Sequence, residues 1–202
     1  MTKKTTHPLG RVGLIHIYTG EGKGKTTSAL GLALRAVGGG LKVIMIQFLK
    51  TSNRYGELAG ADRLKPGFEI VQMGPQCVRL AENPAADEDC IGCLKCHVDP
   101  ENPRVMDLET ARRALEFAEE CMMSGEYDIV ILDEVNYAIN FGLLSVEEVV
   151  GAIKGRRDTV EVVLTGRSAR QELLDMADYI TEMREVKHPW RTDTGARKGI
   201  EY

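Results

Sequence analysis

A glycine-rich turn between an apolar strand and a helix constrains this chain more than any other feature of its sequence. The apolar run from Val12 to Tyr18 leads directly into Thr19 to Thr27, which reads TGEGKGKTT, and apolar residues at helical spacing follow. At such a turn the free backbone N–H groups and the helix dipole favour an anion, and glycines let the backbone approach it closely. The turn is therefore predicted to hold a polyphosphate.

The side chains of this turn match the phosphate-binding loop, or P-loop, of nucleotide-binding proteins. Lys25 is expected to reach the terminal phosphates, and the Thr26 hydroxyl is expected to bind magnesium. The usual pattern has a glycine where Thr19 stands, but three other glycines keep the turn flexible. A turn that binds nothing is the alternative, and the strand-to-helix setting argues against it. The candidate nucleotide-binding residues here are Gly20, Gly22, Lys23, Gly24, Lys25, Thr26 and Thr27.

A second apolar strand supports this interpretation because it ends in two carboxylates. The run from Ile129 to Leu132 is followed by Asp133 and Glu134. In P-loop proteins such a strand lies beside the first one, and its acid meets magnesium directly or through water. The acid pair alone would be weak evidence, since acidic residues often begin a helix. The candidate magnesium ligands are Thr26, Asp133 and Glu134, and the candidate catalytic residues are Lys25, Thr26 and Glu134.

Short apolar segments alternate with helical ones along the chain, without an internal repeat. This alternation implies parallel strand pairing with right-handed crossovers. We therefore expect a single domain over residues 1–202 with the three-layer α/β fold of the P-loop NTPases. In that fold a doubly wound, mostly parallel sheet carries helices on both faces. Strands are expected at 12–18, 42–48, 68–73, 128–132 and 160–164, with a last edge strand at 179–186.

Local signals also indicate where the helices lie. After the turn, Leu30, Leu34 and Val37 have helical spacing, and the glycines at 38–40 end that helix. A long helix is expected over 106–123. Capping boxes at 145–148 (SVEE) and 168–171 (SARQ) predict two further helix starts.

The composition narrows the classes of function. Aromatic residues make up only 5% of the chain and the net charge is −4, which argues against a general nucleic-acid binder. No apolar stretch is long enough for a membrane span, and the first residues lack the apolar core of a signal peptide. We therefore expect a cytoplasmic protein with neither a membrane nor a nucleic-acid partner.

The stretch from Gly74 to Pro103 is too long for an ordinary connection, so we expect a Cys-rich insert there. Three of its four cysteines have the spacing C-x2-C-x2-C, which in a reducing compartment indicates a metal site before disulfides. Four thiolates suit an iron–sulfur cluster or a zinc ion, and surface cysteines without metal are the alternative. Cys121 lies outside this stretch and is expected in the core. The candidate ligands are Cys77, Cys90, Cys93 and Cys96.

Several further segments are typical of one family of P-loop proteins. They are the loop with its helix, TGEGKGKTTSALGLALRAVGGG, then VIMIQFLK followed by Gly56 and Glu57, the strand IVILDEVNYAI and the turn LTGR. The most discriminating piece is the ending, with MREVKH at 183–188 and GIEY at 199–202. From Gly13 onward, except in the stretch 74–103, the chain resembles the P-loop ATP:corrinoid adenosyltransferases.

This resemblance implies an unusual use of ATP. In the family, the Co(I) of a reduced corrinoid attacks the 5′ carbon of the ribose and displaces intact triphosphate, with Mg²⁺ present. The resemblance also implies an electron donor, such as a flavoprotein, and a homodimer. By matching position, the resemblance adds Glu57, Arg184, Lys187 and His188 to the residues that contact ATP or the corrinoid. For His188, the alternative is a structural hydrogen-bonding role.

Two other classes of function stay open on the sequence alone. A P-loop ATPase or phosphotransferase, with Glu134 activating water or a hydroxyl and a regulatory Cys cluster, would form ADP without cobalt. A non-catalytic sensor would read metal or redox state through the cysteines while the loop merely bound nucleotide. The C-terminal motif favours adenosyl transfer, because neither rival requires it.

Overall fold

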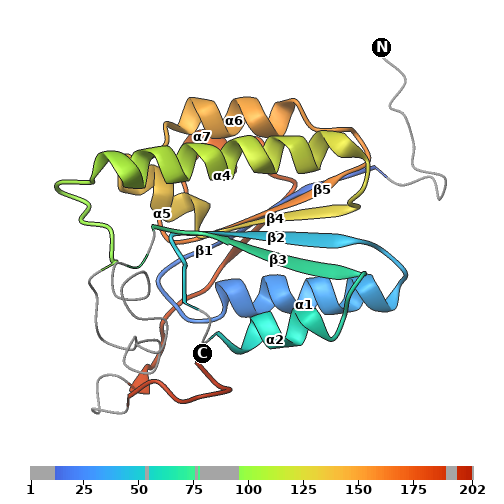
Figure 1. Cartoon of the computed structure of the whole chain (residues 1–202), viewed down its shortest axis with the longest axis horizontal. Helices are drawn as coiled ribbons and strands as arrows, with labels where there is room; N and C mark the ends of the chain where they lie inside the picture. Colours follow the sequence, from blue (N-terminus) through green and yellow to red (C-terminus); the bar gives the residue numbers. More distant parts are fainter. Residues whose placement is uncertain (1–11, 53–54, 76, 78–95, 190–194, 202) are drawn as a thin grey trace.

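A six-stranded parallel sheet forms the centre of the molecule (Figure 1). The structure is a computed structural model that describes residues 12–52, 55–75, 77, 96–189 and 195–201. The strand order is β3-β2-β4-β5-β1-β6. The strands are β1 (Ile15–Thr19), β2 (Val43–Phe48), β3 (Phe68–Met73), β4 (Ile129–Asp133), β5 (Glu161–Thr165) and β6 (Tyr179–Glu182).

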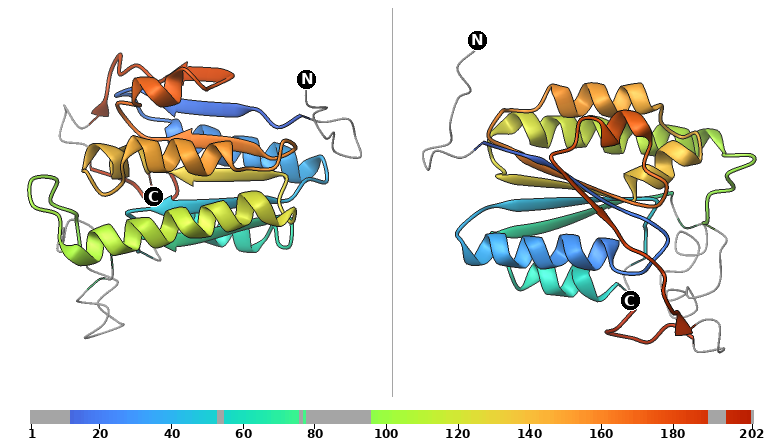
Figure 2. Two further views of the ribbon diagram at one scale, coloured as in Figure 1. Left: turned by 90° about the horizontal axis from the view of Figure 1, so that it is seen from above. Right: turned by 180° about the vertical axis from the view of Figure 1, so that it is seen from behind.

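Helices cover both faces of this sheet, so the predicted three-layer α/β fold is confirmed (Figures 1 and 2). One face carries α1 (Lys25–Gly38) and α2 (Gly56–Asp62). The other face carries α4 (Val105–Ser124), α5 (Val135–Asn140), α6 (Val146–Lys154) and α7 (Gln171–Leu174). The Cys-rich stretch falls mostly outside the described residues, and its character as an insert stays a prediction.

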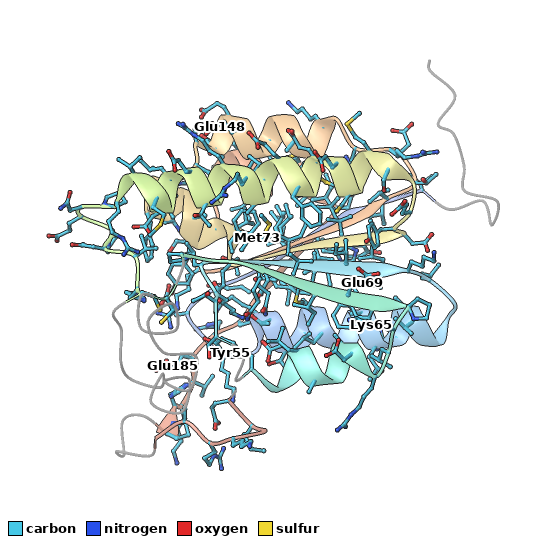
Figure 3. The ribbon with its side chains drawn as sticks, viewed as in Figure 1. Tyr55, Lys65, Glu69, Met73, Glu148 and Glu185 are labelled. Atoms are coloured by element: carbon cyan, nitrogen blue, oxygen red, sulfur yellow. The ribbon has the colours of Figure 1, made fainter. Side chains whose placement is uncertain are left out.

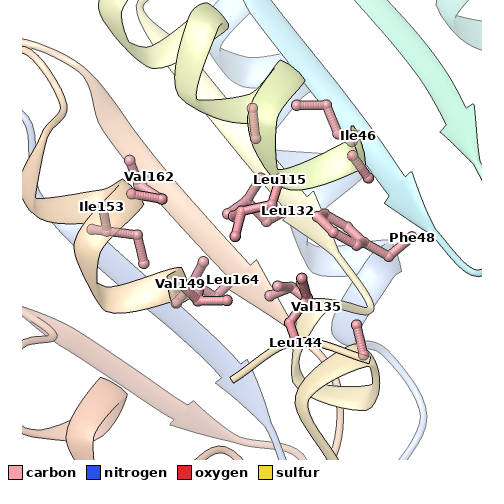
Figure 4. Packing of buried hydrophobic residues seen from close by; sticks show 14 of the residues in the cluster. Ile46, Phe48, Leu115, Leu132, Val135, Leu144, Val149, Ile153, Val162 and Leu164 are labelled. Atoms are coloured by element: carbon pink, nitrogen blue, oxygen red, sulfur yellow. The ribbon is translucent and has the colours of Figure 1, made fainter. Parts of the chain in front are cut away.

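The central strands are buried along their whole length. Every residue of β2, β4 and β5 is buried, as a parallel sheet covered on both faces requires. Figure 4 shows the core between the sheet and the α4 layer, where Ile46, Leu132 and Leu164 of three strands share one cluster with Leu115 and Ile153 of two helices. A second cluster fills the space between the sheet and α1.

Helix α1 packs on the sheet through small residues. Its buried apolar residues are Ala29, Ala33 and Ala36. Each of them comes one residue before a member of the predicted apolar face, which consists of Leu30, Leu34 and Val37. Leu34 is 60% exposed, and the other two members of the predicted face are only partly buried. The helix is therefore rotated by about 100° from the prediction, because one residue corresponds to that angle. Alanines let a helix approach the sheet more closely than leucines do.

The position predicted for the acid-bearing strand β4 is wrong. We expected it beside β1, but β5 lies between the two, and β4 pairs with β2 on its other side. Because all the strands are parallel, their carboxyl ends still meet at one edge of the sheet. Gln47 at the end of β2 is in register with Asp133 at the end of β4. The acid therefore stays close to the loop that follows β1.

One predicted capping box is confirmed and the other is wrong. Ser145 caps α6, accepting from the Glu148 backbone N–H at 3.2 Å, while the Glu148 carboxylate accepts from the Ser145 N–H at 2.7 Å. Ser168 instead adopts φ 50° in the turn after β5, and α7 begins only at Gln171. The last strand is an edge strand, as predicted, but it ends at Glu182.

None of the helices in the described parts of the chain is both long and apolar enough to cross a membrane. The longest one, α4, carries charged residues along its whole length. The cytoplasmic location stays a prediction.

Replacing Ser145 with Ala should lower the free energy of unfolding by about 1 kcal/mol, because the Glu148 N–H loses its acceptor and the reciprocal box is broken. The matched control Ser168→Ala should change it by less than about 0.5 kcal/mol, since Ser168 caps no helix. Urea unfolding of the three proteins measures both values. Equal losses from the two substitutions would contradict this account of the helix starts.

Candidate nucleotide-binding site

The phosphate loop between β1 and α1 is held by the segment that follows β6. The Gly22 N–H donates to the Met183 carbonyl at 2.6 Å, and a Cβ at Gly22 would lie 2.8 Å from the Arg184 carbonyl oxygen. Gly20 has φ +95°, and a Cβ there would lie 2.6 Å from the Met183 oxygen. Gly24, with φ +120°, would place a Cβ in open space. The first two glycines are therefore required by the protein's own backbone, whereas the third borders the cavity.

A cavity of about 440 Å³ opens above the loop, within the range of small-molecule sites. The C-terminal residues close one side of it, because the Lys23 ammonium donates to the Ile200 carbonyl at 3.3 Å and to Glu201 Oε1 at 3.0 Å. Figure 2 shows this C-terminal segment returning to the amino end of α1. The cavity is lined by Lys23, Gly24, Lys25, Thr26, Thr27, Leu30, Lys50, Tyr55, Gly56, Glu57, Glu134, Gly199, Ile200 and Glu201.

The lysine of the loop is buried and bonded to the loop itself. Lys25 Nζ donates to the carbonyl oxygens of Gly20 and Gly22, both at 2.8 Å. Burial lowers the pKa of Lys25, and the nearby Glu134 carboxylate opposes that effect. A phosphate chain in the cavity offers the ammonium stronger acceptors than these two carbonyls.

Asp133 is the centre of the polar network beneath the cavity. Its side chain is fully buried and accepts four hydrogen bonds. Oδ1 accepts from the hydroxyls of Thr26 at 2.8 Å and Thr165 at 2.7 Å. Oδ2 accepts from Lys50 Nζ at 2.8 Å and Gln47 Nε2 at 3.2 Å. The carboxylate thus joins the first turn of α1 to the carboxyl ends of β2 and β5.

Glu134, the next residue, borders the cavity with an unsatisfied oxygen. It has φ 65°, and its N–H donates to the Thr165 hydroxyl at 2.9 Å. Its Oε2 is buried and has no hydrogen-bond partner among the described residues. Burial and the neighbouring Asp133 charge together raise the pKa of Glu134 to about 6. A buried carboxylate oxygen without a donor, in a residue that lines the same cavity as Thr26, suits a hard cation such as Mg²⁺.

Lys50 and Tyr55 form a part of the site that the sequence analysis missed, and they lie beside the predicted Glu57. The Lys50 ammonium lies 3.8 Å from Glu57 Oε1 and 5.1 Å from the centre of the Tyr55 ring, which Figure 3 labels. Burial lowers the pKa of Lys50, but its hydrogen bond to Asp133 and the charges of Asp133, Glu134 and Glu57 together outweigh burial, so the pKa is raised. The available signal was a polar residue two positions after a buried parallel strand, where ligand sites concentrate.

The structure separates the candidate residues into two groups. Lys23 to Thr27, Glu57 and Glu134 lie at the cavity, and Asp133 lies beneath it. Gly20 and Gly22 instead pack against the segment after β6. Arg184, Lys187 and His188 lie after β6 and are not among the described residues that line the cavity. Arg184 contacts the loop through its backbone, and its side chain is exposed.

The predicted cysteine site lies largely outside the described residues. Cys90 and Cys93 belong to the part that is not described, whereas Cys77 is buried and Cys96 partly buried. Within the described part of the chain, no group of three or more potential ligands of the His, Cys, Asp or Glu type could hold a metal ion. Cys121 is buried in the core as predicted, and burial raises its pKa to about 11.

The parallel sheet, the glycine loop at the amino end of α1 and the acids at the end of β4 define a P-loop nucleotide-binding protein. Residues 11–202 match the family model described as ATP:corrinoid adenosyltransferase BtuR/CobO/CobP. The chain therefore belongs to the ATP:corrinoid adenosyltransferase family.

Named relatives agree with this assignment. The corrinoid adenosyltransferase of Escherichia coli K12 is 34% identical over 94% of this chain and 86% of its own length. The corrinoid adenosyltransferase CobA of Salmonella typhimurium LT2 is 32% identical over 94% of this chain and 86% of its own length. An uncharacterized protein of Nostoc sp. PCC 7120 is 36% identical over 93% of this chain, but the chain spans only 50% of that relative.

The raised pKa of Glu134 predicts a pH-dependent stability of the free protein. The protonated carboxyl group of Glu134 contributes its full stabilisation at pH values below its ordinary pKa of 4.5. Because its pKa in the folded state is about 6, this contribution is lost as the pH rises through 6. Glu134→Gln should therefore be more stable than wild type at pH 8 by about 1–2 kcal/mol, with the difference vanishing near pH 4.5.

Urea unfolding in EDTA across this pH range measures the effect. Glu116→Gln, at an exposed position of α4, is the control and should show little pH-dependent difference from wild type. An advantage of Glu134→Gln that stays constant from pH 4.5 to pH 8 would contradict the assignment of the shift to this carboxyl group.

Proposed function

We propose that this chain transfers the 5′-deoxyadenosyl group of ATP to the Co(I) of a reduced corrinoid and releases triphosphate. Family membership supports this proposal, as do relatives named corrinoid adenosyltransferase. The structural observation that carries it is the shared cavity of the P-loop and the C-terminal motif, since Gly199 to Glu201 line the same space as Lys25. Simple hydrolysis of ATP requires no such segment.

The reaction is a displacement at carbon. An electron pair of Co(I) forms the cobalt–carbon bond, the bond from C5′ to its phosphate oxygen breaks, and the triphosphate departs with the electron pair of the broken bond. No side-chain nucleophile is needed, so the protein acts by holding the reactants and stabilising the leaving group. In the proposed complex, Lys25 exchanges its two carbonyl partners for phosphate oxygens, and loop N–H groups bind the others.

We assign Mg²⁺ to the oxygens of Thr26, Asp133 and Glu134, directly or through water. The unpartnered Glu134 Oε2 and the bond from Thr26 to Asp133 support this assignment. When bound, Mg²⁺ neutralises charge on the departing triphosphate. A P-loop site completes its coordination with phosphate oxygens and water, so it needs no cluster of three acidic side chains.

The remaining candidate residues are assigned by position. Glu57 lines the cavity and is proposed to contact the nucleotide. Arg184, Lys187 and His188 follow the strand that supports the loop, and we propose that they contact phosphate or the amide and carboxylate rim of the corrinoid. The exposed side chains of Arg184 and Lys187 support this role, because they are accessible to a large ligand.

Partners follow from the chemistry and the family. Co(I) is strongly reducing, so we propose an electron donor such as a flavoprotein.

We also propose that the chain forms a single domain over residues 1–202 and assembles as a homodimer. Sedimentation analysis tests the dimer.

A metal at the cysteines is a further part of the proposal. The burial of Cys77 supports a ligand role in a cluster with Cys90, Cys93 and Cys96. Anaerobically purified protein should then contain iron with labile sulfide, or zinc, in stoichiometric amount, and Cys93→Ser should lose it. Elemental analysis and a sulfide assay measure this. Wild-type protein without iron, sulfide and zinc would end the metal assignment.

An ATPase or phosphotransferase is the second candidate, and one observation favours it. Glu134 borders the cavity with a pKa near 6, which suits a general base at neutral pH. Its products would be ADP and a phosphorylated acceptor or phosphate, formed without corrinoid.

An anaerobic assay with MgATP and chemically reduced corrinoid separates the two functions. We expect a light-sensitive cobalt–carbon product and one triphosphate per product. Lys25→Ala should reduce the rate by about 100-fold or more, because the leaving triphosphate loses its buried cation. Lys154→Ala, at the end of α6 on the opposite face, is the matched control and should retain full activity. ADP formed at the same rate without corrinoid would overturn adenosyl transfer.

A further inference from the structure

Lys50 is a largely buried cation at the cavity, and the proposed reaction assigns no role to it. It follows β2, lines the same cavity as Lys25, and its side chain is only 15% exposed. Its ammonium donates to Asp133 Oδ2 at 2.8 Å and lies 3.8 Å from Glu57 Oε1. The face of the Tyr55 ring, 5.1 Å away, supports the same charge.

The carboxylate that binds this ammonium is also the one that bonds the P-loop threonine. Asp133 accepts from Lys50 through Oδ2 and from Thr26 through Oδ1. Glu134, whose Oε2 has no partner among the described residues, borders the same cavity. The proposed magnesium ligands attract a cation to this region. In the free protein, the ammonium of Lys50 occupies it.

We propose that Lys50 is a second phosphate-binding residue, which is held by Asp133 in the free protein and moves to the polyphosphate when the magnesium nucleotide binds. This inference rests on the proposed magnesium nucleotide site. It adds that Lys50 keeps free divalent cations out of the empty site, so that the metal enters together with its nucleotide.

Electrostatics supplies the reason for the movement. A divalent cation and an ammonium cannot share Asp133 at contact distance in a poorly solvated site, because their repulsion is strong and weakly screened there. Lysine has a flexible four-carbon stem, so the ammonium can leave Asp133 without backbone movement. The cavity that Lys50 lines is the place where a phosphate chain would offer it negative charge.

The contacts with Glu57 and Tyr55 fit this exchange. At 3.8 Å the Glu57 carboxylate attracts the ammonium without a close hydrogen bond, and the Tyr55 ring attracts it without a directional bond. Both residues line the cavity, so they keep the charge beside the phosphate chain after Asp133 releases it.

The test uses two neutral variants of the full chain, Lys50→Met and Lys50→Gln. The second keeps an N–H donor for the buried Asp133 and so guards against loss of folding. Mn²⁺ binding to the nucleotide-free protein is measured by electron paramagnetic resonance, and tripolyphosphate binding with Mg²⁺ by calorimetry. We expect Mn²⁺ to bind about tenfold more tightly and tripolyphosphate about tenfold more weakly in both variants.

Lys65→Met is the matched control, because it removes one positive charge from an exposed ion pair with Asp62. Figure 3 shows Lys65 well apart from Tyr55, toward the other end of the sheet. This variant should bind both probes as the wild type does. A merely structural role of Lys50 would instead weaken both probes together.

Unchanged or weaker Mn²⁺ binding in the Lys50 variants, or unchanged tripolyphosphate binding, would overturn the inference. Neither measurement uses a corrinoid or follows adenosyl transfer. Failure of the proposed reaction is therefore distinguishable from failure of the role assigned to Lys50.

Discussion

The buried carboxylate of Asp133 is the interaction on which the nucleotide site depends. A charge without exposure to water must be compensated by close donors, and here Thr26, Thr165, Lys50 and Gln47 supply them. These donors come from the start of α1 and from the ends of β2 and β5. One compensated charge thus sets the distance between the phosphate loop and the carboxyl edge of the sheet. Truncating any donor changes a shared network and affects more than one pairwise contact.

The sequence predicted the fold well wherever the signal was local. The third strand has the predicted bounds, Phe68 to Met73, because a short apolar run between breakers is sufficient evidence for a buried strand. The capping box at Ser145 was recognisable for the same reason. At Ser168 a motif of the same type failed, because the turn after β5 fixes that residue in a left-handed conformation. Strand order depends on contacts between distant segments, and local patterns carry no information about it.

For the candidate site too, the residues that a local motif identifies were predicted, and those that depend on distant contacts were not. The P-loop carries its own motif, so its residues were identified, and those from Lys23 to Thr27 lie at the cavity. Gln47, Lys50 and Thr165 lie in segments typical of the family, but no motif assigns a role to these residues. Their roles emerge only when three strand ends are placed side by side. The two short helices α2 and α5 were also missed, since seven and six residues give too little periodicity to recognise.

The bond from Gly22 to the Met183 carbonyl has a consequence for folding. The loop follows the first strand of the sheet, whereas its support follows the last, and contacts between such distant segments form late. The loop therefore reaches its final conformation only after β6 has joined the edge of the sheet. A ligand that binds the completed loop stabilises only chains with a finished sheet. Nucleotide should thus protect β6, an exposed edge strand, against local opening.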